Sequence, residues 1–209
     1  MSNKEGEEKD LKVILLGECG VGKSNIILRF TNGEFNEDSI TTNSTSYIMK
    51  SIKKNGITYR INVWDTAGQE KFRSITKMFL KDASIIILVY SIVDKKSFEC
   101  LDYWYGTIID ICDKDTIIGI VGNKYDLFSE RVIEDETAIK FALEKKAFVK
   151  FISAKDDQLG VDDLFNFALD KYIEKNKNEN KQRRKSLKIQ KDQKSVKIQK
   201  KNVVINDFL

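Results

Sequence analysis

Short apolar runs separated by polar segments predict the strands of this chain. Residues 11–17 (LKVILLG) and 83–94 (ASIIILVYSIVD) are continuous apolar stretches of the kind found in strands buried on both faces of a sheet. Residues 116–127 (TIIGIVGNKYDL) and 149–155 (VKFISAK) each predict a strand that runs into a loop. Residues 46–65 contain Asn-Gly between two strand-like halves, which predicts an antiparallel hairpin.

Helical patterns fill most of the spaces between these strands. The segments expected to be helical are residues 24–31, 96–111, 134–148 and 161–175. Because strands and helices alternate after the hairpin, the fold class is α/β: a mostly parallel six-stranded sheet with one antiparallel strand and helices on both faces. Ligands of such folds bind at the carboxyl ends of the strands.

The composition limits the class of protein. The chain has 209 residues, 41% of them hydrophobic, which suits one domain with extensions. It contains no histidine, which excludes histidine catalysis and histidine metal ligands. Its three cysteines have no metal-binding spacing and favour a reducing compartment. We expect a flexible extension at 1–10, one domain at 11–175 and a basic tail at 176–209. No apolar run reaches the length of a membrane span, so a cytoplasmic protein is expected.

The net charge of +4 conceals an uneven distribution. Residues 171–209 hold thirteen Lys or Arg and four Asp or Glu, a net +9, which leaves residues 1–170 at −5. The tail repeats Lys185–Lys191 (KSLKIQK) as Lys194–Lys200 (KSVKIQK), without a single apolar stripe at helical spacing. It is either a solvated basic tail or an arm for anionic lipid or an acidic partner. No cysteine follows Cys112, so no prenyl anchor is expected.

The segment Gly17–Ser24 (GECGVGKS) matches the pattern G-x-x-x-x-G-K-S, follows a predicted strand and opens a predicted helix. Gly20 and Gly22 allow backbone N–H groups to converge on phosphate oxygens, and the helix N-terminus adds partial positive charge. Lys23 supplies a full charge toward the outer phosphates, and the Ser24 hydroxyl is a candidate Mg²⁺ ligand. The motif predicts phosphate binding but names no base and no reaction.

The segment Trp64–Glu70 (WDTAGQE) ends the second hairpin strand. Asp65 is placed like an acidic residue that holds Mg²⁺ through water. Gly68 has no side chain to block its N–H from a terminal phosphate, and the Gln69 amide is able to orient a water.

Two later motifs, Asn123–Asp126 (NKYD) and Ser153–Lys155 (SAK), each follow a predicted strand. Either alone is a weak signal that ordinary loops also produce, but together they predict a base pocket. The Asp126 carboxylate is able to accept two hydrogen bonds from adjacent N–H and NH₂ groups, an edge that guanine has and adenine lacks. The Ala154 N–H is able to donate to guanine O6, and the aliphatic part of Lys124 to cover one ring face.

In this order and spacing, the four motifs resemble the Ras superfamily of small GTPases over roughly residues 11–175. Lys71–Thr76 (KFRSIT), Ile87–Tyr90 (ILVY), Lys96–Glu99 (KSFE) and the form NKYDL resemble the Rab family in particular. The resemblance implies a P-loop G domain, GTP or GDP with Mg²⁺ as cofactors, slow GTP hydrolysis, and a switch used in vesicle trafficking.

The resemblance also implies residue roles. Thr42, eighteen residues past Ser24, matches the threonine that ligates Mg²⁺ and contacts the γ-phosphate, and Phe35 matches the aromatic that covers guanine. The expected set is catalytic Gln69, metal ligands Ser24, Thr42 and Asp65, and nucleotide-binding residues Gly17, Gly20, Val21, Gly22, Lys23, Ser24, Phe35, Thr42, Asp65, Gly68, Asn123, Lys124, Asp126, Ser153, Ala154 and Lys155.

The chain departs from the family pattern next to Thr42. Rab proteins usually continue with Ile-Gly-Val-Asp-Phe, whereas this chain has Asn43–Tyr47 (NSTSY), and Ser39 stands where many relatives have a lid tyrosine. The aromatic trio that Rab effectors contact would be Tyr47, Trp64 and Phe79. Nucleotide chemistry is expected to survive these changes, whereas recognition of typical Rab effectors is placed in doubt.

The expected partners are an exchange factor, a GTPase-activating protein and effectors. A monomer is expected, with no nucleic-acid partner and weak contact of the tail with anionic membrane. Two alternatives remain open: a scaffold that holds nucleotide with little hydrolysis, and a small GTPase of another signalling branch. An ATPase or nucleotide kinase is disfavoured by the NKYD and SAK segments.

Overall fold

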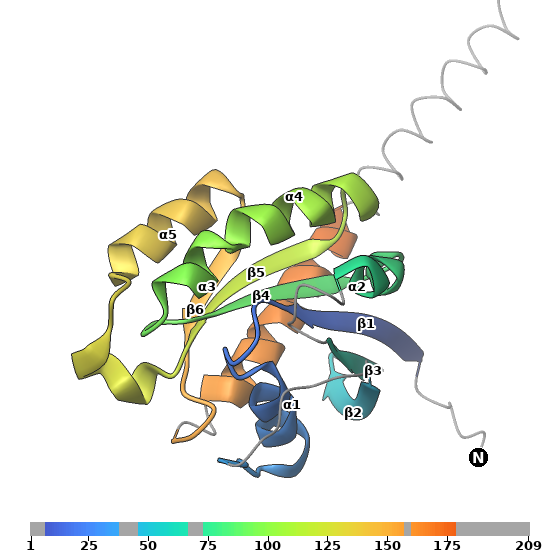
Figure 1. The fold of residues 1–209 in the computed structure, drawn as a ribbon. Helices are drawn as coiled ribbons and strands as arrows, with labels where there is room; N and C mark the ends of the chain where they lie inside the picture. The colour runs from blue at the N-terminus through green and yellow to red at the C-terminus, as the bar shows by residue number, and fades with distance from the viewer. Residues whose placement is uncertain (1–6, 38–45, 67–72, 157–159, 179–209) are drawn as a thin grey trace, which may run out of the picture. The chain divides into compact units, whose positions relative to one another are not determined.

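The computed structural model describes residues 7–37, 46–66, 73–156 and 160–178 (Figure 1). The chain divides into two units, residues 1–169 and 170–209, and the whole sheet lies in the first. Within the second unit the described residues, 170–178, are helical. None of the helices that the structure describes combines the length and apolar character needed to cross a membrane.

Six strands form one sheet in the order β2-β3-β1-β4-β5-β6. Only β2 runs antiparallel to its neighbour β3, and the other pairs are parallel, which confirms the predicted fold class. The strands are β1 (Glu8–Leu16), β2 (Ser46–Lys54), β3 (Ile57–Asp65), β4 (Ile85–Ser91), β5 (Ile117–Asn123) and β6 (Phe148–Phe151).

The helices cover both faces of the sheet (Figure 1). They are α1 (Lys23–Asn32), α2 (Arg73–Leu80), α3 (Lys95–Glu99), α4 (Leu101–Ile111), α5 (Asp135–Glu144) and the helical residues 160–178, with a 3₁₀ helix at Tyr125–Glu130. Two of the helices differ from the sequence prediction. One helix was expected over residues 96–111, and the structure has two, α3 and α4, that meet at Cys100 (φ −71°, ψ −10°). The Cys100 N–H donates to the Lys96 carbonyl and the Trp104 N–H to the Cys100 carbonyl, so the backbone stays close to helical there. The sequence analysis assigns no element to α2, because eight residues are too few for periodicity to decide.

The hairpin forms where the Asn-Gly pair predicts it. Asn55 and Gly56 both have positive φ (53° and 78°), as the two central residues of a type I′ turn require. The ladder runs from Lys54 opposite Ile57 to Ser46 opposite Asp65, so the turn fixes the register that brings Asp65 to the end of β3.

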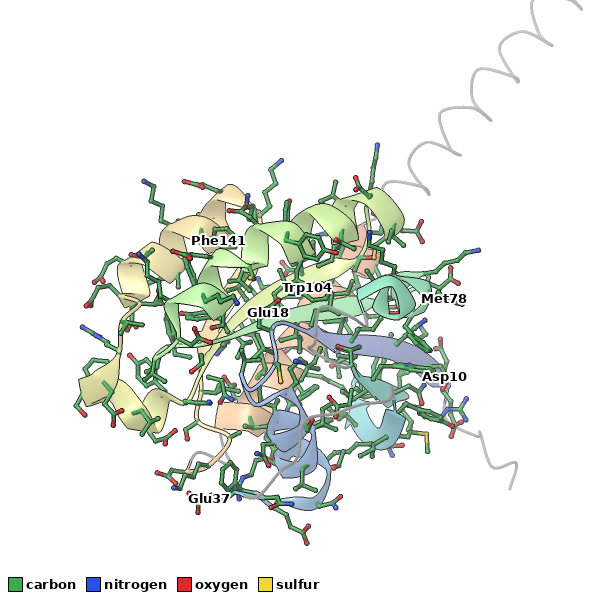
Figure 2. All side chains as sticks on the ribbon, viewed as in Figure 1. Asp10, Glu18, Glu37, Met78, Trp104 and Phe141 are labelled. Carbon is green, nitrogen blue, oxygen red and sulfur yellow. The ribbon has the colours of Figure 1, made fainter. Side chains whose placement is uncertain are left out.

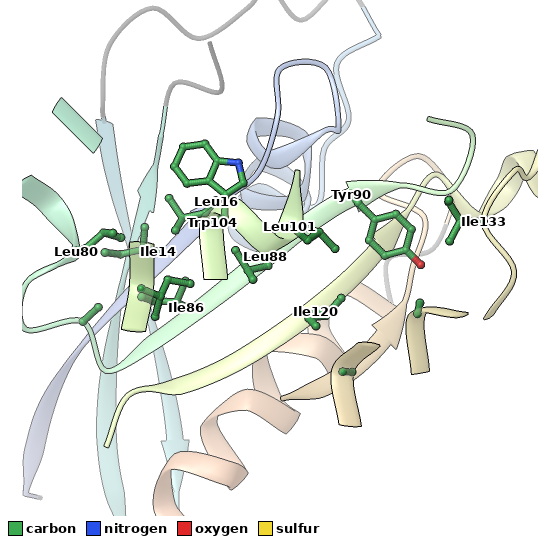
Figure 3. Close-up of a cluster of buried hydrophobic side chains, with 14 of the residues drawn as sticks. Ile14, Leu16, Leu80, Ile86, Leu88, Tyr90, Leu101, Trp104, Ile120 and Ile133 are labelled. Carbon is green, nitrogen blue, oxygen red and sulfur yellow. The ribbon is translucent and has the colours of Figure 1, made fainter. Parts of the chain in front are cut away.

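One face of the sheet packs against α2, α4 and α5. Ile14, Leu16, Ile86, Leu88, Tyr90 and Ile120 form this face, and Leu80, Leu101, Trp104 and Ala138 cover it from the helices (Figure 3). Full burial of a large aliphatic side chain contributes about 1.5–3 kcal/mol. All seven residues of β4 are buried, which explains why this strand reads as an unbroken apolar run.

Neighbouring residues in a strand point to opposite faces, so Val13, Leu15 and Ile87 lie toward the second face. Helix α1 packs there, and its Phe30 ring stacks on the Phe165 ring with centroids 3.7 Å apart. This packing fixes α1 at the end of the loop that joins it to β1.

Strand β1 begins at Glu8, inside the segment that the sequence analysis assigned to an N-terminal extension. Residues 8–10 pair with Thr58–Arg60 of β3. The Arg60 guanidinium also bonds the carboxylates of Asp10 (2.6 Å) and Glu8 (2.9 Å). Pairing with β3 and the ion pairs of Arg60 therefore extend β1 beyond its apolar residues.

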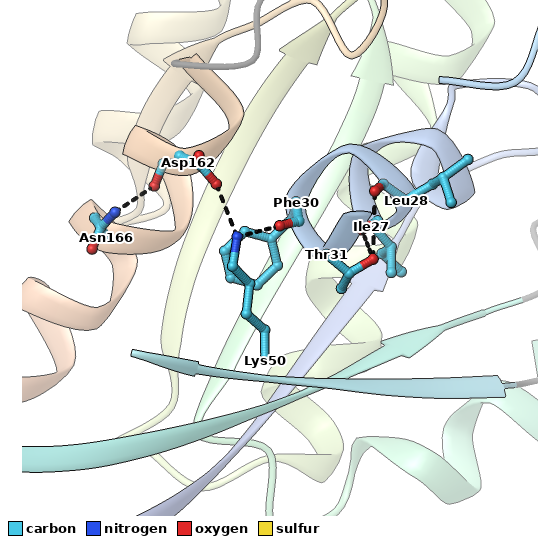
Figure 4. A network of polar contacts seen from close by, with 7 residues as sticks. All are labelled: Ile27, Leu28, Phe30, Thr31, Lys50, Asp162 and Asn166. Carbon is cyan, nitrogen blue, oxygen red and sulfur yellow. Dashed lines mark hydrogen bonds and ion pairs between the residues drawn. The ribbon is translucent and has the colours of Figure 1, made fainter. Parts of the chain in front are cut away.

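Lys50 anchors the edge strand β2 to the helices behind it (Figure 4). Its Nζ donates to the Phe30 carbonyl and lies 3.3 Å from Asp162 Oδ1. The same ammonium sits 4.3 Å from the centroid of the Phe30 ring. These contacts hold β2 against the C-terminal end of α1.

Candidate functional site

The motif residues gather at one edge of the sheet, where parallel strands end. Gly17 follows β1, Asp65 ends β3, Asn123 ends β5 and Ser153 comes two residues after β6. Since β1, β3, β5 and β6 run in the same direction, these four positions share one edge. The structure therefore brings together segments that lie up to 136 residues apart in the chain.

The loop between β1 and α1 depends on its glycines. Gly17, Gly20 and Gly22 all have positive φ, between 78° and 145°. A Cβ on Gly17 would lie 2.1 Å from the Val89 carbonyl oxygen, and one on Gly22 would lie 2.3 Å from Asn123 Nδ2. The backbone therefore approaches both neighbours too closely for any side chain. The resulting concave loop ends at the N-terminus of α1, as a phosphate cradle requires.

Lys23 is buried beneath this loop. Its Nζ donates to the carbonyl oxygens of Gly17 (2.9 Å) and Glu18 (2.8 Å). Burial lowers the pKa of Lys23 to about 8, against the opposing attraction of Asp65, Cys19 and Glu18. A buried ammonium of this kind is stabilised by an anion, so the site favours a phosphate group next to the loop.

Ser24 and Asp65 meet at the mouth of the same loop. The Ser24 hydroxyl donates to Asp65 Oδ2 at 2.7 Å, which joins the first turn of α1 to the end of β3. A hydroxyl and a carboxylate are hard oxygen ligands, and Mg²⁺ takes few protein oxygens when phosphates and water supply the others. The two side chains therefore fit a Mg²⁺ ion bound together with a nucleotide.

Thr66 positions the end of β3, a role that the sequence pattern did not predict. Its buried hydroxyl donates to the Leu15 carbonyl at 2.6 Å and so ties the end of β3 to β1. This bond fixes the backbone beside Asp65. Its position directly after the acidic residue is the only signal in the sequence that points to it.

Asn123 joins the phosphate loop to the last motif. Its Nδ2 donates to the Val21 carbonyl at 2.8 Å, and its Oδ1 accepts from the Ala154 N–H at 3.1 Å. The side chain is buried. The Ala154 N–H that the sequence analysis assigns to guanine O6 thus has a protein acceptor in this structure, which a base would have to share.

Ser153 orients the Asp126 carboxylate. The Ser153 hydroxyl donates to Asp126 Oδ1 at 2.5 Å and accepts from the Asp156 N–H at 3.0 Å. Within the first of these motifs, Lys124 adopts the left-handed region (φ 65°, ψ 37°), and the Tyr125 N–H donates to the Ile152 carbonyl, next to the second motif. The two base-pocket segments are therefore one hydrogen-bonded unit.

Arg29 on α1 clamps the same unit from the other side, and sequence reasoning missed it. Its Nε donates to the Ala154 carbonyl at 2.9 Å. Its Nη2 donates to the backbone carbonyl of Lys155 at 2.5 Å, and its Nη1 donates to the backbone carbonyl of Gly33 at 2.8 Å. Lys155 in turn pairs with Glu37 at 3.0 Å, and that carboxylate raises the pKa of Lys155. No local pattern reveals an arginine whose acceptors lie 125 residues away.

The loop after α1 is held by a pair of asparagines. Asn25 Nδ2 donates to the Asn36 carbonyl, and the Asn36 N–H donates to Asn25 Oδ1, both at 2.9 Å. Phe35 lies directly before Asn36 and is half-buried. Thr42, Gly68, Gln69 and Ser39 lie outside the described residues.

The three aromatics expected to form a partner surface are in contact. The rings of Tyr47 and Trp64 stack with centroids 5.3 Å apart, and Trp64 lies 5.3 Å from Phe79. Tyr47 is 60% exposed, so the trio reaches the surface beside β2 and α2.

The chain is similar to a known family and to several known proteins. The Ras family model matches residues 12–174. Ras-related protein SEC4 of Saccharomyces cerevisiae is 35% identical over 181 residues, which cover 86% of this chain and 82% of that protein. Ras-related protein RabC of Dictyostelium discoideum is 38% identical over 165 residues, covering 78% and 84%. Ras-related protein Rab-30 of Homo sapiens is 36% identical over 154 residues, covering 74% and 75%.

Proposed function

The chain belongs to the Ras family and is a Rab-like small GTPase that binds GTP and GDP with Mg²⁺ and hydrolyses GTP, and we propose that the residues described above carry this cycle. The observation that supports the assignment best is the Asn123 side chain, because it bonds the phosphate loop and the base-pocket loop together. A site joined in this way suits a ligand with phosphates at one end and a base at the other.

The proposed phosphate site consists of the glycine loop, Lys23, Ser24 and Asp65. The Lys23 ammonium, held by the loop carbonyls through two of its N–H groups, would donate to the outer phosphates with the third, and the N–H groups at the start of α1 would donate to phosphate oxygens. Bound Mg²⁺ would neutralise charge on the phosphates, held by Ser24 and Asp65 together with Thr42. The protein thereby stabilises charge that develops during phosphoryl transfer.

Gln69 is proposed to position the attacking water, and Thr42 to report the γ-phosphate to the segment around it. Each role follows from the motif that contains the residue. Because Gln69 acts on a water rather than on bound nucleotide, it affects the rate of hydrolysis more than nucleotide affinity.

Guanine selectivity is proposed to rest on Asp126, oriented by Ser153. The carboxylate accepts from the guanine edge, Lys124 and Phe35 cover the ring faces, and the Ala154 N–H donates to O6. A polar pocket of this kind rejects adenine because the wrong base leaves buried groups unpaired.

The switch acts with an exchange factor, an activating protein and effectors. We assign effector binding to the aromatic trio Tyr47, Trp64 and Phe79, and we place the switch in vesicle trafficking, as the Rab-type similarity suggests. The altered segment Asn43–Tyr47 adjoins this surface, so its effectors are proposed to differ from those of typical Rab proteins.

The experiment that tests the cycle is single-turnover hydrolysis of bound GTP, compared between wild type and Gln69→Leu. The wild type should release phosphate with Mg²⁺ present, and the variant should do so much more slowly while GDP affinity changes less than twofold. Equal rates would remove Gln69 from the mechanism. Nucleotide binding without any hydrolysis by the wild type would favour the alternative of a nucleotide-holding scaffold.

The basic tail is proposed to visit anionic cytosolic membrane surfaces. Each Lys or Arg near such a surface contributes about 1 kcal/mol, and the attraction decays within a Debye length of about 8 Å at physiological salt. Sedimentation with anionic vesicles should therefore show binding that falls as salt rises and disappears when residues 181–209 are removed. Binding that resists salt, or survives the deletion, would place the contact elsewhere.

A further inference from the structure

Glu18 introduces a carboxylate into the phosphate loop, where negative charge opposes anion binding. The side chain accepts a hydrogen bond from the indole N–H of Trp104 on α4, with Oε1 3.2 Å from Nε1 (Figure 2). The two residues are 86 positions apart in the chain. A contact at this place needs an explanation, because a small residue would create no such charge beside the phosphates.

Trp104 is rigid enough to serve as an anchor. Its side chain is 1% exposed and packs in the core that α2, α4 and α5 form on the sheet (Figure 3). Leu16, the last residue of β1 before the loop, belongs to the same core. An indole N–H that is buried requires an acceptor, and here the loop carboxylate provides one.

The backbone of Glu18 has a second role. Its carbonyl oxygen accepts from Lys23 Nζ at 2.8 Å, next to the same bond from the Gly17 carbonyl. Glu18 is thus held through its side chain by α4 and holds the phosphate-binding ammonium through its main chain. Gly17 and Gly20 limit the backbone conformation of the loop less than other residues would, so contacts with the rest of the protein hold its shape.

We propose that Trp104 and the Glu18 side chain are positioning residues for nucleotide binding, which hold the phosphate loop so that the Glu18 carbonyl orients the Lys23 ammonium. The proposal rests on the proposed function, since it concerns the retention of nucleotide in that site. It predicts that the bond slows the release of bound GDP, while neither side chain contacts the base.

Variants of both partners test the bond. Trp104→Phe keeps an aromatic ring but removes the donor, and Glu18→Ala removes the acceptor. Each should accelerate the release of a fluorescent GDP analogue by about threefold to tenfold, the range of one typical hydrogen bond. Glu18→Gln retains an oxygen acceptor, so its release rate should stay within about twofold of the wild type.

The double variant Trp104→Phe/Glu18→Ala should release GDP no more than about twofold faster than the faster single variant, because both changes remove the same contact. Tyr105→Phe is the matched control. It removes a hydrogen bond from the same helix, to the Lys145 carbonyl at 3.2 Å, and should leave the release rate unchanged. Thermal unfolding of the five variants and the wild type separates effects on nucleotide release from effects on stability alone.

Three results would overturn the proposal. Glu18→Ala could release GDP at the wild-type rate, or Glu18→Gln could release GDP as fast as Glu18→Ala does. In the third, the increase in the GDP release rate of the double variant would equal the product of the increases in the two single variants. The second result would assign the effect to charge rather than to the hydrogen bond. Failure of the wild-type protein to bind GDP would instead contradict the proposed function, so the two failures are distinguishable.

Discussion

Replacing Asn123 with alanine removes the connection between the phosphate loop and the base-pocket loop. The side chain is 2% exposed, so water does not replace its bonds easily. The change leaves the Val21 carbonyl and the Ala154 N–H without the partners they have in the structure. Both groups belong to the main chain and remain in place after the substitution.

The loss of stability on this substitution can be worked out from these two main-chain groups. A buried polar group that loses its partner costs about 1–3 kcal/mol, and partial relaxation of the loops lowers the combined cost to about 2–4 kcal/mol. For a protein of this size, that loss corresponds to a fall in melting temperature of about 5–15 °C. Because the same loops hold both ends of the nucleotide, GDP release should be about thirtyfold faster or more.

Two measurements check this expectation: thermal unfolding at a fixed excess of GDP, and the release rate of a fluorescent GDP analogue. Asn62→Ala is the control, since that side chain makes an exposed contact with Asp10 at 3.4 Å, away from the site. It should change the melting temperature by no more than about 2 °C. If Asn123→Ala released GDP within twofold of the wild-type rate, the argument that Asn123 unites the site would be refuted.

Two further predictions concern the base and the phosphates. Asp126→Ala should weaken GDP binding by about a hundredfold or more, as measured by titration calorimetry. ATP should not compete with GDP for the wild type or for the variant. If ATP competed as well as GTP does, the base-pocket assignment would be wrong. The lowered pKa of Lys23, about 8 before nucleotide binds, means that the group loses its proton as the pH rises above 8 and must regain it to face the phosphates. GDP affinity should therefore fall by roughly tenfold between pH 7 and pH 9. At the higher pH, GDP binding should be accompanied by proton uptake, which calorimetry in two buffers measures. A GDP affinity that does not change with pH would mean that the buried ammonium does not titrate in this range.

The phosphate loop shows why part of the site was predictable. Its glycines, Lys23 and Ser24 are consecutive, so the local backbone alone places a cradle before a helix. The hairpin is similar, because positive φ at Asn55 and Gly56 is a property of those two residues. The unbroken apolar runs likewise predicted β1 and β4 as buried strands, and residues 116–127 predicted the strand β5 and the loop after it, with errors confined to the strand ends.

Tertiary contacts decide where several strands and helices begin and end. Glu8–Asp10 has no strand pattern of its own, and it is extended because β3 and Arg60 lie beside it. Helix α2 is too short to be stable alone and depends on Leu80, which packs in the core. At Cys100 the expected single helix is described as two, α3 and α4, although helical hydrogen bonds continue through this residue.

The amino-acid sequence by itself determined which chemical groups this protein brings to its site and the order in which they follow the strands. It did not determine how those groups hold one another. Arg29 reaches Ala154, Asn123 reaches Val21, and Trp104 reaches Glu18. Each of these bonds joins a helix or strand to a loop that follows a different strand, and its geometry exists only after the sheet has placed the strand ends side by side. The physical reason is that hydrogen bonds act over about 3 Å in space, whereas periodicity and motif spacing record neighbours along the chain.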